Sequence, residues 1–427
     1  MLQAVSGLKL QNRHILGGIG VRLPTMSKKH VLYVSGSVGL GHVVRDLAIA
    51  HELRKQNPEL EISWLACHPA TVLLKESGEE LASETSLYGN DNVPAERAAE
   101  KGFRLNVLKY AFNAGKEWKQ NVRAFRRAVR RRRFDVVVAD EAYEIASEVA
   151  AGVVRPRAPF VMIFDCFGSD SVTRNPVERL LIYVSNLWWL SVSKLCSRKR
   201  NLGLFVGEPE DIPEGKLGFL LPNRREYARA NLKFVGYVLP FDSAEYKDKT
   251  EVRARLGHGE EPLVVCAIGG TSIGRELLEL CGRAYPIIRK TLPNLRMVLV
   301  CGPRLAPQSL HVPNGVDIRG YVPRLYEHLA ASDLAIVQGG GTTTLELTAL
   351  KRPFLYFPLG QHFEQQVHVA GRLARHKAGV RMSYSETTPT ALAAKVISNL
   401  GKKVSYPPIP TDGAQKAAEL IHELLGC

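Results

Sequence analysis

The amino-acid sequence predicts an α/β fold with two domains, each built on a doubly wound parallel sheet. Short apolar strands alternate with helical segments along the chain, and a glycine-rich loop follows the first strand of each half. Strands that are apolar on both faces and alternate with helices are typical of parallel sheets covered by helices. With 427 residues, the chain is long enough for two or three packed domains.

The N-terminal half opens with an apolar strand that ends in a glycine loop. Residues 30–35 form this strand, Gly39 and Gly41 lie in the loop, and apolar residues at helical spacing follow. The other strands expected in this half are residues 61–66, 134–139 and 160–164. Strand, glycine loop and helix therefore follow one another at the start of the first domain.

The C-terminal half repeats this order after a polar linker. A strand at residues 263–268 runs into a glycine loop at 269–274, and a helix begins near Arg275. The remaining strands and a closing helix are expected at residues 296–301, 316–320, 334–337, 354–357 and 413–425. Each half is therefore expected to be a Rossmann-like domain.

These patterns divide the chain into four segments. Residues 1–25 have no continuous apolar core of signal-peptide type, so we expect them to be a disordered extension, with Met26 as the natural start and a cytoplasmic protein. The other three segments are an N-terminal Rossmann-like domain, a linker and a C-terminal Rossmann-like domain with its closing helix, at residues 26–240, 241–256 and 257–427.

Composition excludes several classes of protein. A hydrophobic fraction of 45% with 23% charged residues is too apolar for a disordered chain and too rich in charge for a polytopic membrane protein. Seven scattered cysteines without a CxxC pair indicate a reducing compartment, without a disulfide framework or zinc site. The net charge is +15, and residues 101–200 carry most of it, with 20 Lys and Arg against 9 Asp and Glu.

A third glycine cluster, directly after the strand at 334–337, predicts a nucleotide site. Glycines 339–341 let a ligand approach the backbone, and the hydroxyls of the three following threonines can donate to phosphate oxygens. Glu346 can accept hydrogen bonds from both hydroxyls of a ribose. The alternative is that the glycines only form a tight turn.

A polar segment after the next strand suits a sugar. Glu364, Gln365 and Gln366 offer a carboxylate and two amides, which can distinguish the stereochemistry of sugar hydroxyls. Together with the glycine cluster, this segment predicts a site for a nucleotide sugar.

With these motifs, residues 28–425 resemble the GT-B glycosyltransferases that use nucleotide sugars. The C-terminal half is most similar to the families of the lipid II-forming N-acetylglucosaminyltransferase of peptidoglycan synthesis and of the UDP-dependent natural-product glycosyltransferases. Gln338 stands where many natural-product enzymes carry a phosphate-binding histidine, so one positive charge is missing there. The resemblance places the following residues at the donor: Gly270, Thr271, Ser272, Tyr321, Val322, Gln338, Gly340, Gly341, Thr342, Thr343, Thr344, Glu346, Glu364, Gln365 and Gln366.

The resemblance also implies a mechanism. His42, at the end of the first glycine loop, is the candidate base for the acceptor hydroxyl, with Gly39 and Gly41 lining the acceptor side. Asp140 is its expected partner and Asp165 the rival, although aspartates at strand ends also cap helices. Inversion in a single displacement, without metal or cofactor beyond the nucleotide sugar as co-substrate, is implied; no Asp-x-Asp motif of the other glycosyltransferase fold is present.

Two stretches of the acceptor-side domain suggest an anionic membrane surface as a partner. Seven arginines lie between Arg123 and Arg133 on an amphipathic pattern, and the apolar run 180–193 is followed by a basic border. A solvated surface helix for the first, and a buried helix or acceptor-pocket wall for the second, remain open. The run of 14 residues is too short to span a bilayer, which takes about 20. Nucleic acid is not expected as a partner.

The sequence therefore predicts a cytoplasmic enzyme, peripheral on the inner face of the cell membrane. It would transfer a hexosyl group from a nucleotide diphosphate sugar, with UDP favoured over dTDP, to a hydrophobic or lipid-linked acceptor. Two alternatives stay open: a nucleotide-sugar 2-epimerase or hydrolase on the same scaffold, which the pattern from Gly39 to Arg45 resembles, and a non-catalytic nucleotide-sugar-binding partner of a membrane complex.

Overall fold

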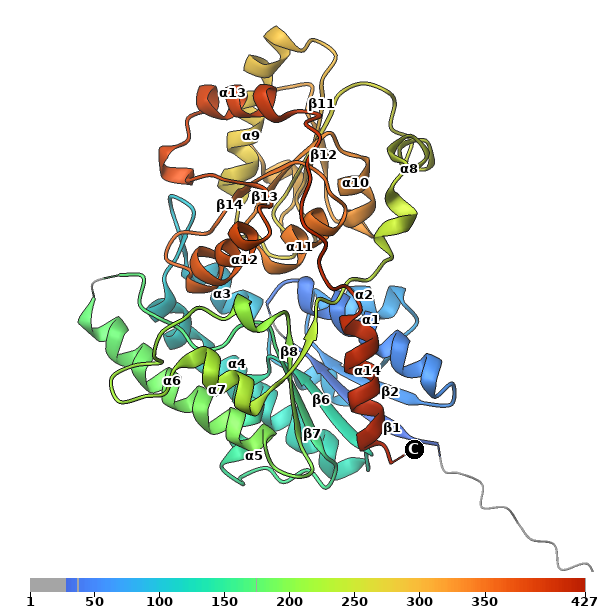
Figure 1. The fold of residues 1–427 in the computed structure, drawn as a ribbon, viewed down its shortest axis with the longest axis vertical. Coiled ribbons are helices and arrows are strands. Elements are labelled where there is room, and N and C mark those ends of the chain that lie inside the picture. Colours follow the sequence, from blue (N-terminus) through green and yellow to red (C-terminus); the bar gives the residue numbers. More distant parts are fainter. Residues whose placement is uncertain (1–27, 37, 174, 427) are drawn as a thin grey trace, which may run out of the picture.

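The computed structural model describes residues 28–36, 38–173 and 175–426, so the predicted extension at 1–25 lies outside the described residues. Two α/β domains are stacked one on the other, each with its own parallel sheet (Figure 1). The predicted fold class is confirmed. Every predicted strand forms, and no boundary differs by more than two residues.

The N-terminal domain contains a seven-stranded sheet with the order β3-β2-β1-β6-β7-β8-β9. All its neighbouring strands pair in parallel. Its strands are β1 (His30–Ser35), β2 (Glu61–Ala66), β3 (Glu80–Leu81), β6 (Val136–Asp140), β7 (Phe160–Phe164), β8 (Leu202–Val206) and β9 (Lys233–Gly236). Its helices are α1 (Gly41–Gln56), α2 (Ala70–Glu76), α3 (Asn92–Ala98), α4 (Val107–Arg131), α5 (Tyr143–Ala150), α6 (Pro176–Cys196) and α7 (Arg224–Asn231), with the 3₁₀ turns η1 (Ser83–Leu87) and η2 (Pro209–Asp211).

The C-terminal domain contains a six-stranded parallel sheet with the order β12-β11-β10-β13-β14-β15. Its strands are β10 (Leu263–Ala267), β11 (Arg296–Val300), β12 (Asp317–Arg319), β13 (Leu334–Gln338), β14 (Phe354–Phe357) and β15 (Val380–Arg381). The helices after the linker are α8 (Lys249–Arg255), α9 (Arg275–Thr291), α10 (Leu325–Ala331), α11 (Gly341–Ala349), α12 (Ala370–Arg375), α13 (Pro389–Asn399) and α14 (Gly413–Leu424), with short turns η3 (Ser243–Tyr246), η4 (Pro307–Ser309), η5 (Glu364–Val369) and η6 (Tyr384–Glu386).

In both sheets the strand order reverses at the first strand of the domain, and this reversal positions the site. β1 lies between β2 and β6, and β10 lies between β11 and β13. At such switch points the loops leaving the carboxyl ends of the strands diverge and leave a crevice for a ligand. Ser35 at the end of β1 is paired in register with Asp140 at the end of β6, so the first glycine loop and Asp140 lie at the same crevice.

A hairpin of the N-terminal domain is built into the C-terminal domain. It consists of β4 (Ala99–Glu100) and β5 (Arg104–Leu105). The Leu105 N–H donates to the Gly360 carbonyl at 2.9 Å, and the Gly360 N–H donates to the Phe103 carbonyl at 2.8 Å. Phe103 and Leu105 are buried in the core that β10, α9 and α13 form. The two domains are therefore joined by shared core as well as by the linker.

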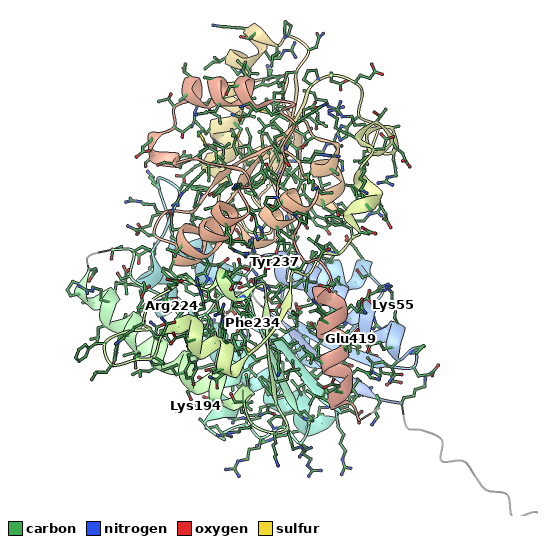
Figure 2. The ribbon with its side chains drawn as sticks, in the orientation of Figure 1. Lys55, Lys194, Arg224, Phe234, Tyr237 and Glu419 are labelled. Atoms are coloured by element: carbon green, nitrogen blue, oxygen red, sulfur yellow. The ribbon has the colours of Figure 1, made fainter. Side chains whose placement is uncertain are left out.

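The last helix returns to the first domain, which differs from the predicted boundary. α14 was expected to close the C-terminal domain, but it packs against α1 beside the N-terminal sheet (Figure 1). Ala417, Ala418 and Ile421 are fully buried there, whereas Glu419 lies on its exposed face (Figure 2). A small apolar stripe that fits the groove beside α1 explains this placement, because burial of that stripe stabilises the first domain.

Both stretches considered for a membrane role are helical. The arginine-rich segment lies on α4, whose inner face buries Ala124, Phe125 and Ala128. The run 180–193 lies on α6, which buries Trp189 and Val192. In the part of the chain that the structure describes, no helix combines the length and hydropathy needed to cross a bilayer.

Candidate active site between the domains

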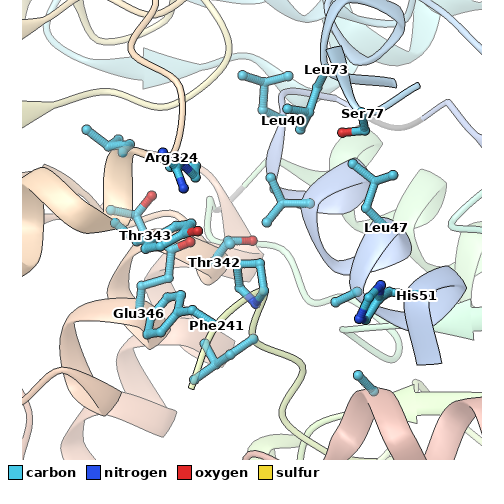
Figure 3. Close-up of a pocket in the computed structure, with 18 of the residues that line it drawn as sticks. Leu40, Leu47, His51, Leu73, Ser77, Phe241, Arg324, Thr342, Thr343 and Glu346 are labelled. Atoms are coloured by element: carbon cyan, nitrogen blue, oxygen red, sulfur yellow. The ribbon is translucent and has the colours of Figure 1, made fainter. Parts of the chain in front are cut away.

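A cavity of about 1030 Å³ lies between the domains, at the carboxyl ends of the C-terminal strands. Thr342, Thr343 and Glu346 lie on one side of it, and Leu47 and His51 of α1 lie on the other (Figure 3). The predicted donor residues that line it are Gly270, Tyr321, Val322, Thr342, Thr343 and Glu346. These come from separate loops, which the sheet topology brings together.

The third glycine cluster leads directly into α11. Gly340 precedes the helix, Gly341 opens it, and an added Cβ on Gly340 would meet nothing within 4 Å. The first turn of a helix presents unpaired N–H groups and a positive dipole end, which bind anions. Thr344 is different from the two preceding threonines, because it is fully buried and its hydroxyl donates to the Gly340 carbonyl at 2.8 Å.

Glu346 has the properties expected of a ligand-binding carboxylate. It is only 5% exposed, lines the cavity, and has no hydrogen-bond partner among the described residues. Burial raises its pKa to about 8, and no neighbouring charge opposes this shift. A buried carboxylate without a partner is costly, so hydrogen-bond donors of a ligand would relieve that cost.

The glycine loop at residues 269–274, the first predicted donor loop, is held partly by the N-terminal domain. Ser272 N–H donates to the Glu96 carboxylate of α3 at 2.9 Å, and Arg304 pairs with the same carboxylate. The Thr271 hydroxyl accepts from the Ile273 N–H at 3.3 Å. Gly270 alone of the three predicted residues lines the cavity; Thr271 and Ser272 shape the loop.

The first glycine loop of the N-terminal domain contacts both donor loops. An added Cβ on Gly41 would lie 2.4 Å from the Thr342 hydroxyl, and one on Gly270 would lie 2.5 Å from the Leu40 nitrogen. Gly39 has a φ of +89°, which only glycine adopts easily, and its N–H donates to Asn92. The loop predicted for the acceptor side therefore meets the donor side directly.

Tyr321, one of the predicted donor residues, connects the C-terminal domain to the N-terminal domain. Its hydroxyl donates to Glu76 Oε2 of α2 at 3.1 Å. Burial and the neighbouring carboxylate raise its pKa to about 12. Val322 lies beside it in the wall of the cavity.

His42 and Asp140 lie close together, as predicted, and Arg45 lies between them. His42 Nδ1 lies 3.5 Å from Asp140 Oδ2, but Arg45 Nη2 lies only 2.8 Å from the same ring nitrogen. A guanidinium can only donate, so His42 Nδ1 accepts and its proton is on Nε2. That nitrogen is 3.8 Å from Glu141 Oε2.

Arg45 binds both candidate aspartates. Its Nε donates to Asp140 Oδ2 at 2.8 Å, and its Nη1 donates to Asp165 Oδ2 at 2.6 Å. Burial opposes ionisation of Asp140, but the charge of Arg45 outweighs burial and lowers the Asp140 pKa to about 2. The pKa of Asp165 is lowered in the same way. Sequence reasoning missed this role, although Arg45 stands one helical turn after His42.

Glu141 is a further acidic group that sequence reasoning missed. It follows β6 with a φ of +47°, an uncommon conformation for a residue other than glycine. Burial and the charge of Asp165 raise its pKa well above the usual range. One donor atom each of His42, Glu141 and Asp165 lies within 4.8 Å of the others, close enough for a metal ion, but Arg45 already supplies a positive charge to this group.

The predicted sugar-binding segment divides into one residue at the cleft and two that fix the loop. Burial raises the pKa of Glu364, whose charge interacts with Asp165 and His42 across the cleft. The Gln365 Oε1 accepts from the Leu359 N–H at 2.8 Å. The Gln366 amide donates to the Leu359 carbonyl at 3.0 Å and accepts from Arg381 at 2.5 Å.

The side-chain amide of Gln338 also forms its hydrogen bonds inside the protein. With its amide nitrogen donating to the carbonyls of Ile268 (3.2 Å) and Ile273 (3.0 Å), its oxygen accepts from Gln365 Nε2 at 3.1 Å. It therefore ties the first donor loop to the sugar-binding segment. A direct contact with phosphate would require these bonds to break.

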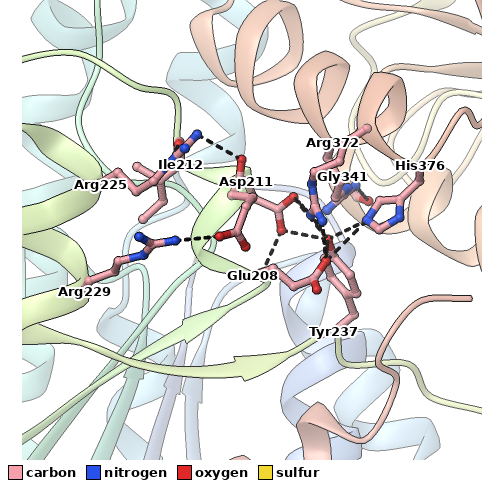
Figure 4. Close-up of polar contacts among 11 residues, drawn as sticks. Glu208, Asp211, Ile212, Arg225, Arg229, Tyr237, Gly341, Arg372 and His376 are labelled. Carbon is pink, nitrogen blue, oxygen red and sulfur yellow. Dashed lines mark hydrogen bonds and ion pairs between the residues drawn. The ribbon is translucent and has the colours of Figure 1, made fainter. Parts of the chain in front are cut away.

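A cation near the glycine cluster comes from α12 instead. Arg372 Nη2 donates to the Gly341 carbonyl at 2.6 Å and to the Thr344 hydroxyl at 3.2 Å. Arg375 and His376 of the same helix bind Glu208, Asp211 and Tyr237 beside the crossing between the domains (Figure 4). Gln338 supplies no positive charge, but Arg372 places one next to Gly341 and Thr344.

Comparisons with known proteins agree with this geometry. The crystal structure of the glycotransferase of kitacinnamycin superposes with a TM-score of 0.57 at 16% identity, over 93% of this chain and 95% of that one. Residues 264–424 match the glycosyltransferase family 28 C-terminal domain. The chain has the GT-B fold, and its C-terminal domain matches the family 28 model. The predicted resemblance to the GT-B glycosyltransferases is therefore confirmed.

Curated relatives extend the likeness beyond the family 28 domain. One is the UDP-N-acetylglucosamine--N-acetylmuramyl-(pentapeptide) pyrophosphoryl-undecaprenol N-acetylglucosamine transferase of Carboxydothermus hydrogenoformans, 30% identical over 35% of this chain and 42% of that protein. The enzyme of the same name from Clostridioides difficile is 21% identical over 92% of this chain and 87% of its own. The first two curated relatives are matched over only 42% and 53% of their length.

Proposed function

We propose that this chain transfers a hexosyl group from a nucleotide diphosphate sugar, with UDP as the nucleotide, to a hydroxyl of a hydrophobic or lipid-linked acceptor. The reaction would invert the anomeric centre, need no metal, and take place in the cytoplasm at the inner face of the cell membrane. The observation that carries the proposal is the interdomain cavity, where an unpartnered buried carboxylate, Glu346, lies two turns from the open N-terminus of α11.

Each part of a nucleotide sugar has a counterpart in the cleft. Tyr321 and Val322 offer a wall for the base, Glu346 accepts from ribose hydroxyls, and the start of α11 faces the diphosphate. Glu364 lies between this loop and His42, at the place where the sugar would extend. The two relatives named above, whose names describe transfer of N-acetylglucosamine from a UDP-sugar to a pyrophosphoryl-undecaprenol acceptor, support this choice of substrates.

The charges of the cleft suit a single displacement. The leaving diphosphate gains negative charge, which the N–H groups at the start of α11 and the nearby Arg372 would stabilise. On the opposite side, His42 is the proposed base for the acceptor hydroxyl. Since Arg45 occupies His42 Nδ1, the base function requires Arg45 to shift toward the aspartates, or Glu141 to accept the proton instead.

Replacing Glu346 by alanine should weaken binding of UDP by about tenfold to a hundredfold, because hydrogen bonds to a charged group contribute about 1.5–3 kcal/mol. The measurement is a thermal-shift titration, in which a ligand at 100 times its dissociation constant stabilises by about 2.7 kcal/mol. Glu419→Ala, on the exposed face of α14, is the matched control. Equal binding of UDP by both variants would contradict the ribose assignment.

Glu346→Gln should change the pH dependence of stability. The folded state raises the pKa of this group from its ordinary value of 4.5 to about 8, so the wild type loses stability as the pH rises from about 5 through 8. An amide has no such penalty. Thermal unfolding from pH 6 to pH 9 should therefore favour the variant increasingly at high pH, and parallel curves would show that Glu346 is not buried as a neutral acid.

The two alternative functions differ in their products. An epimerase would interconvert the donor, and a hydrolase would release free sugar from the UDP-sugar without an acceptor. A non-catalytic binder would retain nucleotide binding without turnover on any acceptor. Incubation of the full chain with UDP-N-acetylglucosamine, with and without a lipid-linked acceptor, separates all three from transfer; release of UDP that depends on the acceptor supports the proposed function.

A further inference from the structure

The exposed face of α6 carries an unbroken apolar stripe. Its members are large side chains at helical spacing: Val177, Leu180, Leu181, Val184 and Leu187. Leu180 is 63% exposed and Val184 is 53% exposed. The periodicity of α6 therefore produces two apolar faces, one packed in the core around Trp189 and one at the surface. A helix face of this kind, outside the core, marks an interaction site.

A neighbouring loop extends the stripe. Phe219 is 81% exposed and Leu220 is 83% exposed, and Leu220 has a φ of +61°. The Tyr183 hydroxyl of α6 donates to the Phe219 carbonyl at 3.1 Å, and Asn186 donates to the Leu217 carbonyl at 2.6 Å. These bonds hold the loop against α6, so its two apolar tips belong to the same surface.

The exposed charges at the C-terminal end of α6 are basic. Lys194, at the C-terminal end of α6 (Figure 2), is followed by Arg198 and Lys199; all three are exposed, and among the described residues none forms an ion pair. The only carboxylate of α6 is Glu178, which is buried and accepts from Ser171 and Thr173. An exposed apolar stripe with unpaired basic residues at its end is complementary to anionic lipid headgroups over an apolar interior.

The loop that precedes α6 comes from the cleft. It starts at Asp165, which is bound to Arg45, and contains Ser169, whose N–H donates to Asn186 of α6 at 2.9 Å. A bilayer beside α6 would therefore contact a helix that is tied through this loop to the proposed acceptor side. The arginine-rich part of α4 lacks this combination, because its apolar residues face the core.

We propose that α6 and residues 217–221 dock this protein onto an anionic lipid bilayer, with Leu180, Val184, Phe219 and Leu220 inserted among the lipids. This inference rests on the proposed function, since it names the surface from which a lipid-linked acceptor would be taken. It selects the α6 surface, and not the arginines of α4, as the membrane-binding element.

The test is co-sedimentation of the full chain with vesicles of phosphatidylcholine alone or with about 30% phosphatidylglycerol. Binding is expected only to the anionic vesicles, and to fall when the salt is raised from about 0.1 M to about 0.5 M. An apolar variant (Leu180→Gln, Val184→Gln, Phe219→Ser, Leu220→Asn) and a charge variant (Lys194→Gln, Arg198→Gln, Lys199→Gln) should each bind at least about tenfold more weakly. Asn at position 220 accommodates the positive φ.

The matched control removes the same charge from α4. Arg123→Gln, Arg127→Gln and Arg130→Gln are exposed substitutions that should leave vesicle binding within about twofold of the wild type. Equal loss in the α4 and α6 charge variants, or vesicle binding that survives the apolar variant, would overturn the proposal. So would a stable dimer in sedimentation equilibrium that the apolar variant dissociates, because the surface would then bind a second copy.

Thermal shift with UDP separates this inference from the proposed function. All these variants should keep the wild-type response to UDP, which also shows that they fold. Vesicle binding without any response to UDP would leave the docking surface in place and remove the proposed function. A response to UDP without vesicle binding would leave the proposed function in place and overturn the docking surface.

Discussion

Replacing His42 by alanine is expected to lower turnover by about 10²–10⁴-fold while binding of UDP is unchanged. His42 lies beside Asp140 and does not line the cavity that is the proposed donor site. Its loss should therefore remove proton transfer and leave the donor site intact. Single-turnover transfer and a thermal-shift titration with UDP measure the two quantities separately.

Two further variants make this result specific. His311→Ala, an exposed histidine outside the cavity, should keep full turnover. Glu141→Gln tests the other candidate, because Glu141 faces His42 Nε2. Loss of turnover in Glu141→Gln together with wild-type turnover in His42→Ala would move the base function from the histidine to the glutamate.

Replacing Arg45 by methionine is expected to destabilise the protein by about 3–5 kcal/mol, since it leaves two carboxylates in the cleft without their counter-charge. Asp140 is fully buried and pairs with Arg45 through both oxygens. The control is Lys55→Met on the same helix. Lys55 also pairs with a carboxylate, that of Glu52, but its side chain is 58% exposed, so the expected loss is about 1 kcal/mol or less.

The pH dependence of this pair of variants checks the cause. In the wild type the lowered pKa of Asp140 contributes stability above its ordinary value of 3.8, and that contribution is lost as the pH falls through about 2. In Arg45→Met, the main charge that opposes burial is gone, so burial raises this pKa relative to the wild type. The difference in urea-induced unfolding between wild type and variant should therefore be largest near neutral pH and shrink toward pH 4. A constant difference would indicate lost packing rather than lost charge.

The central strands and the glycine loops could be predicted because their determinants are local. Runs such as Val136–Asp140 and Leu263–Ala267 are apolar on both faces, and glycines mark where each strand turns into a helix. Short strands at the edges, such as β3 and β15, were missed because two residues carry no periodicity. The donor cavity followed from motifs that each lie beside one strand.

The remaining parts depend on contacts between distant residues. Nothing local distinguishes Arg45 from a surface arginine of an amphipathic helix; its role requires Asp140 and Asp165, which the sheet brings to it. Gln365 and Gln366 match a sugar-binding pattern, yet their amides are taken by backbone groups that only the folded loop presents. The run 180–193 could be identified as apolar, but which of its side chains are buried and which are exposed depends on how α6 packs.

The β4–β5 hairpin and α14 each pack against the other domain, and this affects how the protein folds during synthesis. Phe103 and Leu105 lack most of their packing partners until the C-terminal domain has been translated, and the face of the N-terminal sheet covered by α1 and α2 stays incomplete until α14 emerges. Synthesis runs from the N-terminus, and domains usually fold as they leave the ribosome. Here the first domain cannot complete its core during translation. A helix made after the whole C-terminal sheet completes the core of the first domain, so removal of residues 413–426 should yield aggregation of nascent chains rather than a shortened folded protein.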